Sequence, residues 1–267
     1  MSADDWHRRV DPSKPHPARM YDYYLGGKDN FEADREAAEQ VLRVLPEVRL
    51  MALENRAFLG RAVRFLAAAG IRQFLDIGTG LPTQGSTSEV AHEVAPDARI
   101  VYVDNDPMVL VHARALLADR APGDTVVIEG DVRDPDAILG HPDVRAVIDF
   151  DQPVALLLVA ILHFVRDSED PAGIVERFMR DMAPGSYLVL SHATHDFDPE
   201  RSAEGSRPYA NATAPFVTRS GAEIKRFFDG LEMVDPGLVQ LPLWRPDGDP
   251  SPHLDAIWVY GGVARRG

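Results

Sequence analysis

The sequence of 267 residues contains no cysteine. This absence excludes disulfides, iron–sulfur clusters, zinc–thiolate sites and thiol nucleophiles from any account of its function. Long apolar runs are missing as well. The longest covers residues 154–162, whereas a membrane-spanning helix needs about 20 residues. The sequence therefore predicts a globular protein that does not span a membrane.

Basic residues are outnumbered, with 28 Lys and Arg against 42 Asp and Glu, for a net charge of −14. This negative charge repels phosphate backbones and anionic membrane surfaces, so we expect neither nucleic acid nor a membrane as a partner. His7, Arg8 and Arg9 stand near the start, but no apolar stretch follows them, which is not typical of a secretory signal. We expect a cytoplasmic protein. Its oligomeric state is unknown from the sequence.

From residue 71 onward, short apolar segments alternate with segments of helical periodicity. Strands are predicted over residues 71–77, 99–103, 125–129, 154–160 and 186–191, with a closing pair over 239–243 and 256–260. Helices are predicted over residues 108–118, 174–182 and 218–228, the last with Thr218 as its N-cap. Such alternation indicates an α/β fold, with a mostly parallel sheet covered by helices on both faces.

The residues before this sheet domain (71–267) divide into two parts. Residues 1–17 are polar and proline-rich, which predicts a flexible tail. Residues 18–70 predict a helical extension with a Gly-Gly turn at residues 26–27, a break at Pro46 and a final glycine at Gly70. We expect this extension to cover the ligand site. Further along, residues 192–214 predict a long polar loop, and such loops are commonly functional or disordered.

A glycine turn follows the first predicted strand, in the run Asp76-Ile77-Gly78-Thr79-Gly80. Ligands of open parallel sheets lie at the carboxyl ends of the strands, and glycine lets the backbone approach a ligand closely. A lone Gly-x-Gly is a weak signal, because it also occurs in turns that bind nothing. The nicotinamide fingerprint requires Gly or Ala where this chain has Thr83, which disfavours an oxidoreductase.

Acidic residues follow the next two strands as well. Asp104 and Asn105 come at the end of the second strand, and Asp131 and Val132 follow the third. A carboxylate at the second position can accept both hydroxyls of a ribose. One at the third can accept the amino group of an adenine, with Val132 against the ring. Any one acid could be a solvated loop residue, but three at successive strand ends predict a site for an adenosine-containing ligand.

These motifs resemble those of the class I S-adenosylmethionine-dependent methyltransferases, including a Leu162-His163 pair after the fourth strand. Residues 21–31, 74–83 and 227–231 are similar to an actinobacterial S-adenosyl methyltransferase family formerly called DUF574, over about residues 17–260. The resemblance implies a Rossmann-like fold with a mostly parallel seven-stranded sheet, methyl transfer as the activity and S-adenosylmethionine as the cofactor. The cofactor-binding residues it implies are Asp76, Gly78, Thr79, Gly80, Asp104, Asn105, Asp131 and Val132. Pro82 replaces the third glycine of most class I motifs and stiffens the loop.

Methyl transfer chiefly requires that the nucleophile be held in line with the methyl group and that water be excluded from the site. A base is needed only where the nucleophile must lose a proton, and His163 is the candidate for that role. The alternative is a buried structural histidine. Tyr21 is a candidate to cover the sulfonium with its ring face, and Lys28 to meet the methionine carboxylate. The alternatives are core packing for Tyr21 and a plain turn for Lys28.

Two imidazoles and two carboxylates stand close together after the fifth strand, at His192, His195, Asp196 and Asp198. Such ligands suit zinc or iron, but a polar substrate loop is the favoured interpretation, so we expect no metal. The leading hypothesis is a methyltransferase with a small-molecule acceptor. The alternative is a non-catalytic module that binds S-adenosylmethionine or S-adenosylhomocysteine to sense it or to dock a partner.

Overall fold

The computed structural model describes residues 9–81, 85–117, 124–249 and 251–267. Its strands are β1 (Gln73–Ile77), β2 (Arg99–Asp104), β3 (Thr125–Glu129), β4 (Ala155–Val159), β5 (Tyr187–Ala193), β6 (Glu232–Met233), β7 (Val239–Gln240) and β8 (Val259–Arg265). They form one sheet in the order β3-β2-β1-β4-β5-β8-β6, with β7 paired to β8. The pairs from β3 to β5 are parallel, and β8 runs antiparallel to β5.

The mostly parallel sheet that the sequence predicted is confirmed, but with eight strands among the described residues instead of seven. The predicted strand 239–243 shortens to β7, because a 3₁₀ turn with Pro242 inside it follows at once. Proline has no N–H to donate to a strand ladder, so pairing stops there. The two residues of β6 pair with the end of β8 and are too few to produce a periodic pattern.

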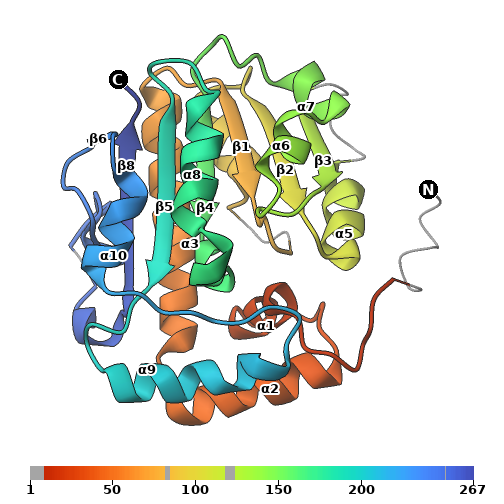
Figure 1. Cartoon of the computed structure of the whole chain (residues 1–267), viewed down its shortest axis with the longest axis vertical. Helices are drawn as coiled ribbons and strands as arrows, with labels where there is room; N and C mark the ends of the chain where they lie inside the picture. The colour runs from red at the N-terminus through yellow and green to blue at the C-terminus, as the bar shows by residue number, and fades with distance from the viewer. Residues whose placement is uncertain (1–8, 82–84, 118–123, 250) are drawn as a thin grey trace.

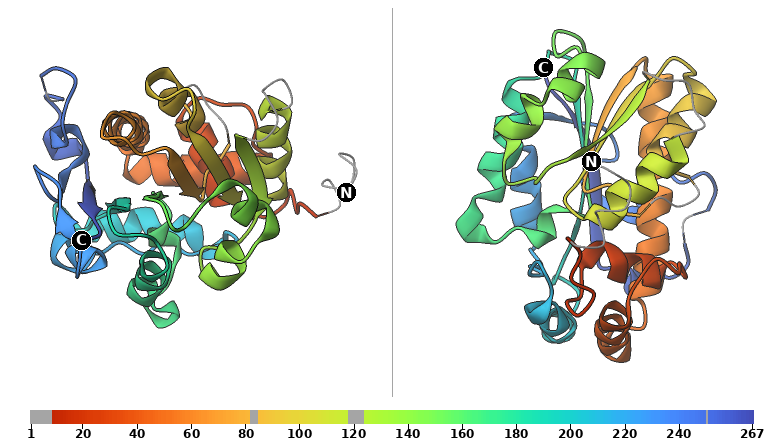
Figure 2. Two further views of the ribbon diagram at one scale, coloured as in Figure 1. Left: turned by 90° about the horizontal axis from the view of Figure 1, so that it is seen from above. Right: turned by 90° about the vertical axis from the view of Figure 1, so that its right-hand side faces the viewer.

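The helices are α1 (Pro17–Tyr24), α2 (Glu32–Val44), α3 (Val48–Ala68), α4 (Thr87–Val94), α5 (Pro107–Leu117), α6 (Pro135–Leu139), α7 (Pro142–Val147), α8 (Pro171–Arg180), α9 (Pro199–Ser206) and α10 (Gly221–Lys225). Helices α3 and α4 cover one face of the sheet, and α6, α7, α8 and α10 cover the other (Figure 2). Side chains alternate between the faces along each strand. Phe74, for example, belongs to the first core and Leu75 to the second.

Helices α1, α2 and α9 form a separate layer beneath the carboxyl ends of the parallel strands (Figure 1). Helix α2 packs against both α1 and α9, and α1 also contacts α3. Helix α9 lies inside residues 192–214, so the prediction of a continuous loop there was wrong. The Asp198 carboxylate caps this helix by accepting a hydrogen bond from Arg201 N at 3.0 Å. This cap, followed by Pro199, is the sequence signal for its start.

The N-cap of α10 also differs from the prediction, which placed it at Thr218. Ser220 caps the helix instead, through a reciprocal pair of hydrogen bonds with Glu223. The Thr218 hydroxyl accepts a hydrogen bond from Ser202 Oγ of α9 at 3.2 Å. The N-cap therefore lies two residues later than expected, and Thr218 joins the helix to the layer beneath the sheet.

The structure describes residues 9–17 of the predicted tail, and they lie along the sheet domain. Arg9 forms an ion pair with Glu129 at the end of β3, and Val10 packs in a small apolar cluster beside α5. Thr213 N donates a hydrogen bond to Pro15 O at 3.0 Å. This segment is thereby tied to two distant parts of the chain. Separately, no helix in the described ranges is long and apolar enough to cross a membrane.

Candidate functional site

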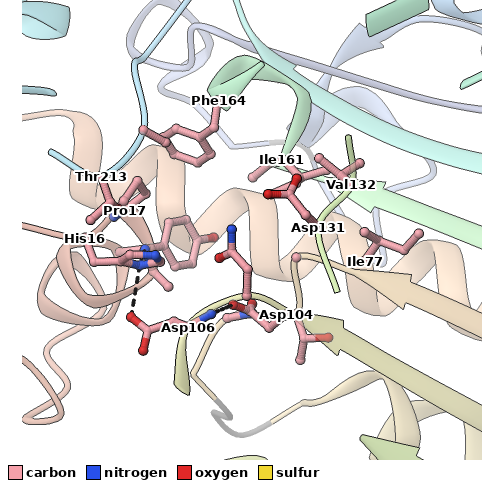
Figure 3. Close-up of a pocket in the computed structure, with 18 of the residues that line it drawn as sticks. His16, Pro17, Ile77, Asp104, Asp106, Asp131, Val132, Ile161, Phe164 and Thr213 are labelled. Atoms are coloured by element: carbon pink, nitrogen blue, oxygen red, sulfur yellow. Dashed lines mark hydrogen bonds and ion pairs between the residues drawn. The ribbon is translucent and has the colours of Figure 1, made fainter. Parts of the chain in front are cut away.

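A cavity of about 370 Å³ opens at the carboxyl ends of β1, β2, β3 and β4 (Figure 3). Cavities of about 300–1,000 Å³ are typical of small-molecule sites. The strand order reverses between β1 and β4, which is the usual position of a ligand in an open α/β sheet. The predicted residues Asp76, Gly78, Thr79, Gly80, Asp104, Asn105, Asp131, Val132 and Tyr21 all line this cavity.

The glycine loop follows β1 in a conformation that only glycine adopts easily. Gly78 has φ +73° and Gly80 has φ +67°, in the left-handed region where a Cβ is unfavourable. A Cβ at Gly78 would also lie 2.6 Å from the Ile161 side chain. Asp76 accepts a hydrogen bond from Thr87 Oγ1 at 2.7 Å, and burial raises the pKa of Asp76 to about 6. Pro82 and Thr83 lie outside the described residues.

Asp104 links the end of β2 to the glycine loop. One carboxylate oxygen accepts a hydrogen bond from Gly80 N at 2.9 Å, and the other accepts one from Asp106 N at the same distance. Burial nevertheless raises the pKa of Asp104 to about 6. The neighbouring Asn105 is exposed at the cavity mouth. A buried carboxylate held by two backbone donors is rigid, and each of its oxygens retains a further lone pair for a ligand.

Asp131 and Val132 stand at the end of β3, on the side of the cavity where Figure 3 also shows Ile77 and Ile161. The Asp131 carboxylate accepts from the Arg133 guanidinium at 2.6 and 2.8 Å and from Arg133 N at 2.9 Å. The buried Val132 side chain and Ile161 supply apolar surface. This end of the cavity therefore combines an apolar surface with one carboxylate.

Tyr21 and Lys28, both predicted to contact the ligand, lie in different places. The Tyr21 hydroxyl donates to Ala52 O and accepts from Asn55 Nδ2, both at 3.0 Å, and burial raises the pKa of Tyr21. Lys28 is exposed on the turn after α1 and does not line the cavity. The structure therefore brings Tyr21 to the site and leaves Lys28 outside it.

Arg56, on α3, is a cavity-lining cation that the sequence reasoning missed. Its Nη2 donates to Leu81 O at 3.2 Å, and its guanidinium lies 5.8 Å from the Tyr21 ring centroid. Its buried Nε has no hydrogen-bond partner among the described residues. An unpaired buried N–H is costly unless a ligand satisfies it. No local motif marks this arginine, because only the packing of α3 under the glycine loop brings it there.

Ala160 was also missed. It directly follows β4 and has φ +56°, a left-handed conformation that is strained for a residue with a side chain. Ala160 N donates to Ser191 Oγ at 2.9 Å, and this hydroxyl donates to Asn55 Oδ1 at 2.6 Å. Strain of this kind is characteristic of functional sites, and here it lies on the cavity wall.

His163 does not line this cavity but a second one, of about 90 Å³, beside it. Its Nδ1 accepts a hydrogen bond from Ala193 N at 3.4 Å. Burial, with the charge of Arg219 nearby, lowers the pKa of His163 well below its ordinary value. The imidazole is therefore neutral and carries its proton on Nε2.

Three of the four residues considered as metal ligands make separate contacts within the protein. His192 donates from Nδ1 to Ala193 O and accepts from Arg219 at Nε2, both at 2.7 Å, and burial lowers its pKa to about 3. Asp196 accepts from Gly221 N, and Asp198 caps α9. Within the described ranges, no three His, Asp or Glu side chains gather as a metal site.

Comparisons with known proteins agree with this geometry. A family model described as S-adenosyl methyltransferase matches residues 3–267. Among solved structures, a DUF574 family protein from Streptomyces avermitilis shares 45% identity over 96% of this chain and 99% of its own, with a TM-score of 0.92. A predicted methyltransferase from Thermobifida fusca shares 46% identity over 95% of this chain and 96% of its own, with a TM-score of 0.89.

A more distant structure has the same fold. Magnesium protoporphyrin IX methyltransferase from Synechocystis, solved with S-adenosylhomocysteine bound, is 13% identical, covers 93% of each chain and has a TM-score of 0.56. No curated protein matches the chain. The full-length family match and the two relatives at 45–46% identity decide the assignment. The chain belongs to the S-adenosyl methyltransferase family and is a methyltransferase that uses S-adenosylmethionine as its cofactor.

Proposed function

We propose that this methyltransferase binds S-adenosylmethionine in the cavity of about 370 Å³ and transfers its methyl group to a small molecule. One observation carries the proposal: the glycine loop, Asp104 and Asp131 come from three strand ends and meet in one cavity. The ribose hydroxyls are assigned to Asp104. The adenine is assigned to the surface formed by Val132 and Ile161, with its amino group toward Asp131. The glycine loop, including Thr79, and Asn105 complete the set around the cofactor.

We assign the methionine carboxylate to Arg56 in place of Lys28. Arg56 lines the cavity beside the glycine loop and has an unsatisfied buried Nε–H, which an anionic oxygen would satisfy. Guanidinium–carboxylate hydrogen bonds are charge-assisted and about twice as strong as neutral ones. Lys28, on its exposed turn, has no comparable position.

When bound, the cofactor supplies an electrophilic methyl group on a sulfonium. The residues of the chain then have to orient the acceptor and exclude water. Tyr21 presents its ring at the boundary of the two cavities, fixed by Ala52 and Asn55. His163 is neutral with its proton on Nε2, so it can donate a hydrogen bond to an acceptor atom in the second cavity. In that tautomer the role of His163 is to position the acceptor, and a base is not required.

The segments that surround the site support the proposal of a small-molecule acceptor. Residues 9–11, 16 and 17 line the cavity, as do residues 213 and 214, and the two segments are joined by the Thr213 N to Pro15 O hydrogen bond. Helices α1 and α3 contribute Tyr21 and Arg56 to the walls. We propose on this basis that residues 18–70 are a covering extension of the sheet domain 71–267, with residues 1–17 before it. Such cover leaves little room for a macromolecular acceptor.

Calorimetry with S-adenosylmethionine and S-adenosylhomocysteine tests the cofactor assignment directly. Both ligands are expected to bind with one site per chain. Absence of heat and of any thermal stabilisation by either ligand at millimolar concentration would contradict the proposed site.

Replacing Arg56 with methionine tests the carboxylate assignment. We expect S-adenosylhomocysteine to bind about tenfold to 150-fold more weakly, because one charge-assisted hydrogen bond is worth about 1.5–3 kcal/mol. 5′-Methylthioadenosine, which lacks the amino-acid moiety, should bind the variant and the native protein alike. The matched control is Arg64→Met on the same helix, whose side chain is exposed and pairs with Asp247. An equal loss for both ligands would refute the assignment.

The affinity for S-adenosylhomocysteine should also depend on pH. Ribose hydroxyls donate to an ionised carboxylate, and burial raises the pKa of Asp104 to about 6. Affinity should therefore be constant above about pH 7 and fall as the pH drops through 6, because free protein then takes up a proton that the complex must release. Asp76 has a similar pKa, so Asp104→Asn serves to separate them. An equally steep profile in that variant would assign the titration to Asp76.

A further inference from the structure

A second cavity, of about 90 Å³, adjoins the proposed cofactor site. It is lined by residues of α1, α2, α3 and α9 and of the ends of β4 and β5. Figure 1 shows α1, α2 and α9 as the layer beneath the sheet. It shares five lining residues with the first cavity: Pro17, Tyr21, Asn55, Ala160 and Phe164. The two cavities therefore meet at one boundary, at the end of β4 where Ala160 has its left-handed conformation.

The residues that line this second cavity carry no charge. They include no Asp, Glu, Lys or Arg, and their one histidine, His163, is neutral. Aromatic rings form much of the wall, with Phe216 stacked on Tyr209 at 4.8 Å between ring centroids. A buried charge without a partner is strongly disfavoured, so an ionised ligand would be rejected here.

Most polar groups of the lining already have partners in the protein. Asn55 is bonded to Tyr21 and Ser191, and the Ser202 hydroxyl to Thr218. The hydroxyls of Tyr24 and Tyr209 lie 3.1 Å apart and use one of their two hydrogens between them. Several donors of the lining are not used by a described residue, among them one tyrosine hydroxyl, the Thr194 and Thr218 hydroxyls and His163 Nε2–H, since Nδ1 is occupied by Ala193 N.

We propose that this second cavity is the methyl-acceptor site, and that the acceptor is an uncharged aromatic molecule with a hydrogen-bond-accepting atom on or beside its ring. The inference rests on the proposed function of the first cavity. A ring matches the aromatic lining, and an accepting atom matches the free donors. The volume is below the roughly 150 Å³ of a dry cavity that holds benzene, so the acceptor has at most one ring, and part of it extends across the shared boundary toward the first cavity.

The test uses three molecules of one shape and different charge: benzamide, benzoate and benzamidine. Each is titrated into the protein saturated with S-adenosylhomocysteine, and binding is followed by saturation-transfer NMR. Benzamide is expected to bind at least tenfold more tightly than either charged analogue. Equal binding of the three would overturn the inference. Failure of S-adenosylhomocysteine itself to bind would instead overturn the proposed function.

Two variants test whether benzamide binds in the second cavity. Met51 lines the second cavity only, so Met51→Trp fills it and should lower benzamide affinity at least tenfold while S-adenosylhomocysteine binds as before. Leu53→Trp makes a similar enlargement on the same helix at a position that is 56% exposed, and it should change neither affinity. If Met51→Trp loses its fold, Ala193→Leu fills the cavity from β5. Unchanged benzamide affinity in a folded filling variant would overturn the proposal.

Discussion

Replacing Asp104 with alanine is expected to weaken S-adenosylhomocysteine binding by about 2–3 kcal/mol, which is about thirtyfold to 150-fold. The loss has two causes. The ribose hydroxyls lose a buried ionic acceptor, and Gly80 N loses the carboxylate oxygen that it contacts at 2.9 Å. The glycine loop is then free to leave the conformation that the cofactor requires. Calorimetry at pH 7.5 measures the change.

The controls separate charge from loop geometry. Asp104→Asn keeps an oxygen that can accept from Gly80 N but loses the charge, so its affinity should fall between that of the native protein and that of Asp104→Ala. Asp97→Ala removes an exposed carboxylate that pairs with Arg72 far from the cavity, and it should have no effect. Native affinity in Asp104→Ala would place the ribose elsewhere.

The sheet and the acids at its edge could be predicted because each depends on short stretches of sequence. Strand β3 was predicted with its observed bounds, and Asp76, Asp104 and Asp131 were assigned to successive strand ends that the structure places together. Parallel strands bring their carboxyl ends to one edge whatever the connecting helices do. Because the strands were predicted correctly, the residues at their carboxyl ends could be predicted to lie close together.

The rest of the site depends on contacts between distant segments, which no local pattern reveals. Arg56 reaches the cavity because α3 packs along the sheet, and His163 faces the second cavity because the layer of α1, α2 and α9 encloses it. Helix α9 was missed because its residues are mostly polar. Its stability comes from the Asp198 cap and from packing on α2, not from an apolar stripe.

Replacing Arg219 with methionine is expected to lower the free energy of unfolding by about 3–5 kcal/mol. The Arg219 side chain is 5% exposed and donates to Leu162 O at 3.0 Å, to Val165 O at 2.8 Å and to His192 Nε2 at 2.7 Å. It also pairs with the exposed Asp167 at 2.7 Å. Methionine fills a similar space but leaves two buried carbonyls and an imidazole without a donor, and each unsatisfied group costs about 1–3 kcal/mol.

Urea denaturation measures this loss, with Arg226→Met as the control because that side chain is exposed and only approaches Glu223. A second measurement tests whether the loss of stability comes from the contact between Arg219 and His192. Burial is the main cause of the His192 pKa of about 3, and the positive charge of Arg219 lowers it further. In the folded variant the imidazole pKa should therefore rise, as measured by NMR. A loss of stability without that rise would mean that Arg219 acts through packing alone, whereas unchanged stability would contradict its role in joining the segment after β4 to β5.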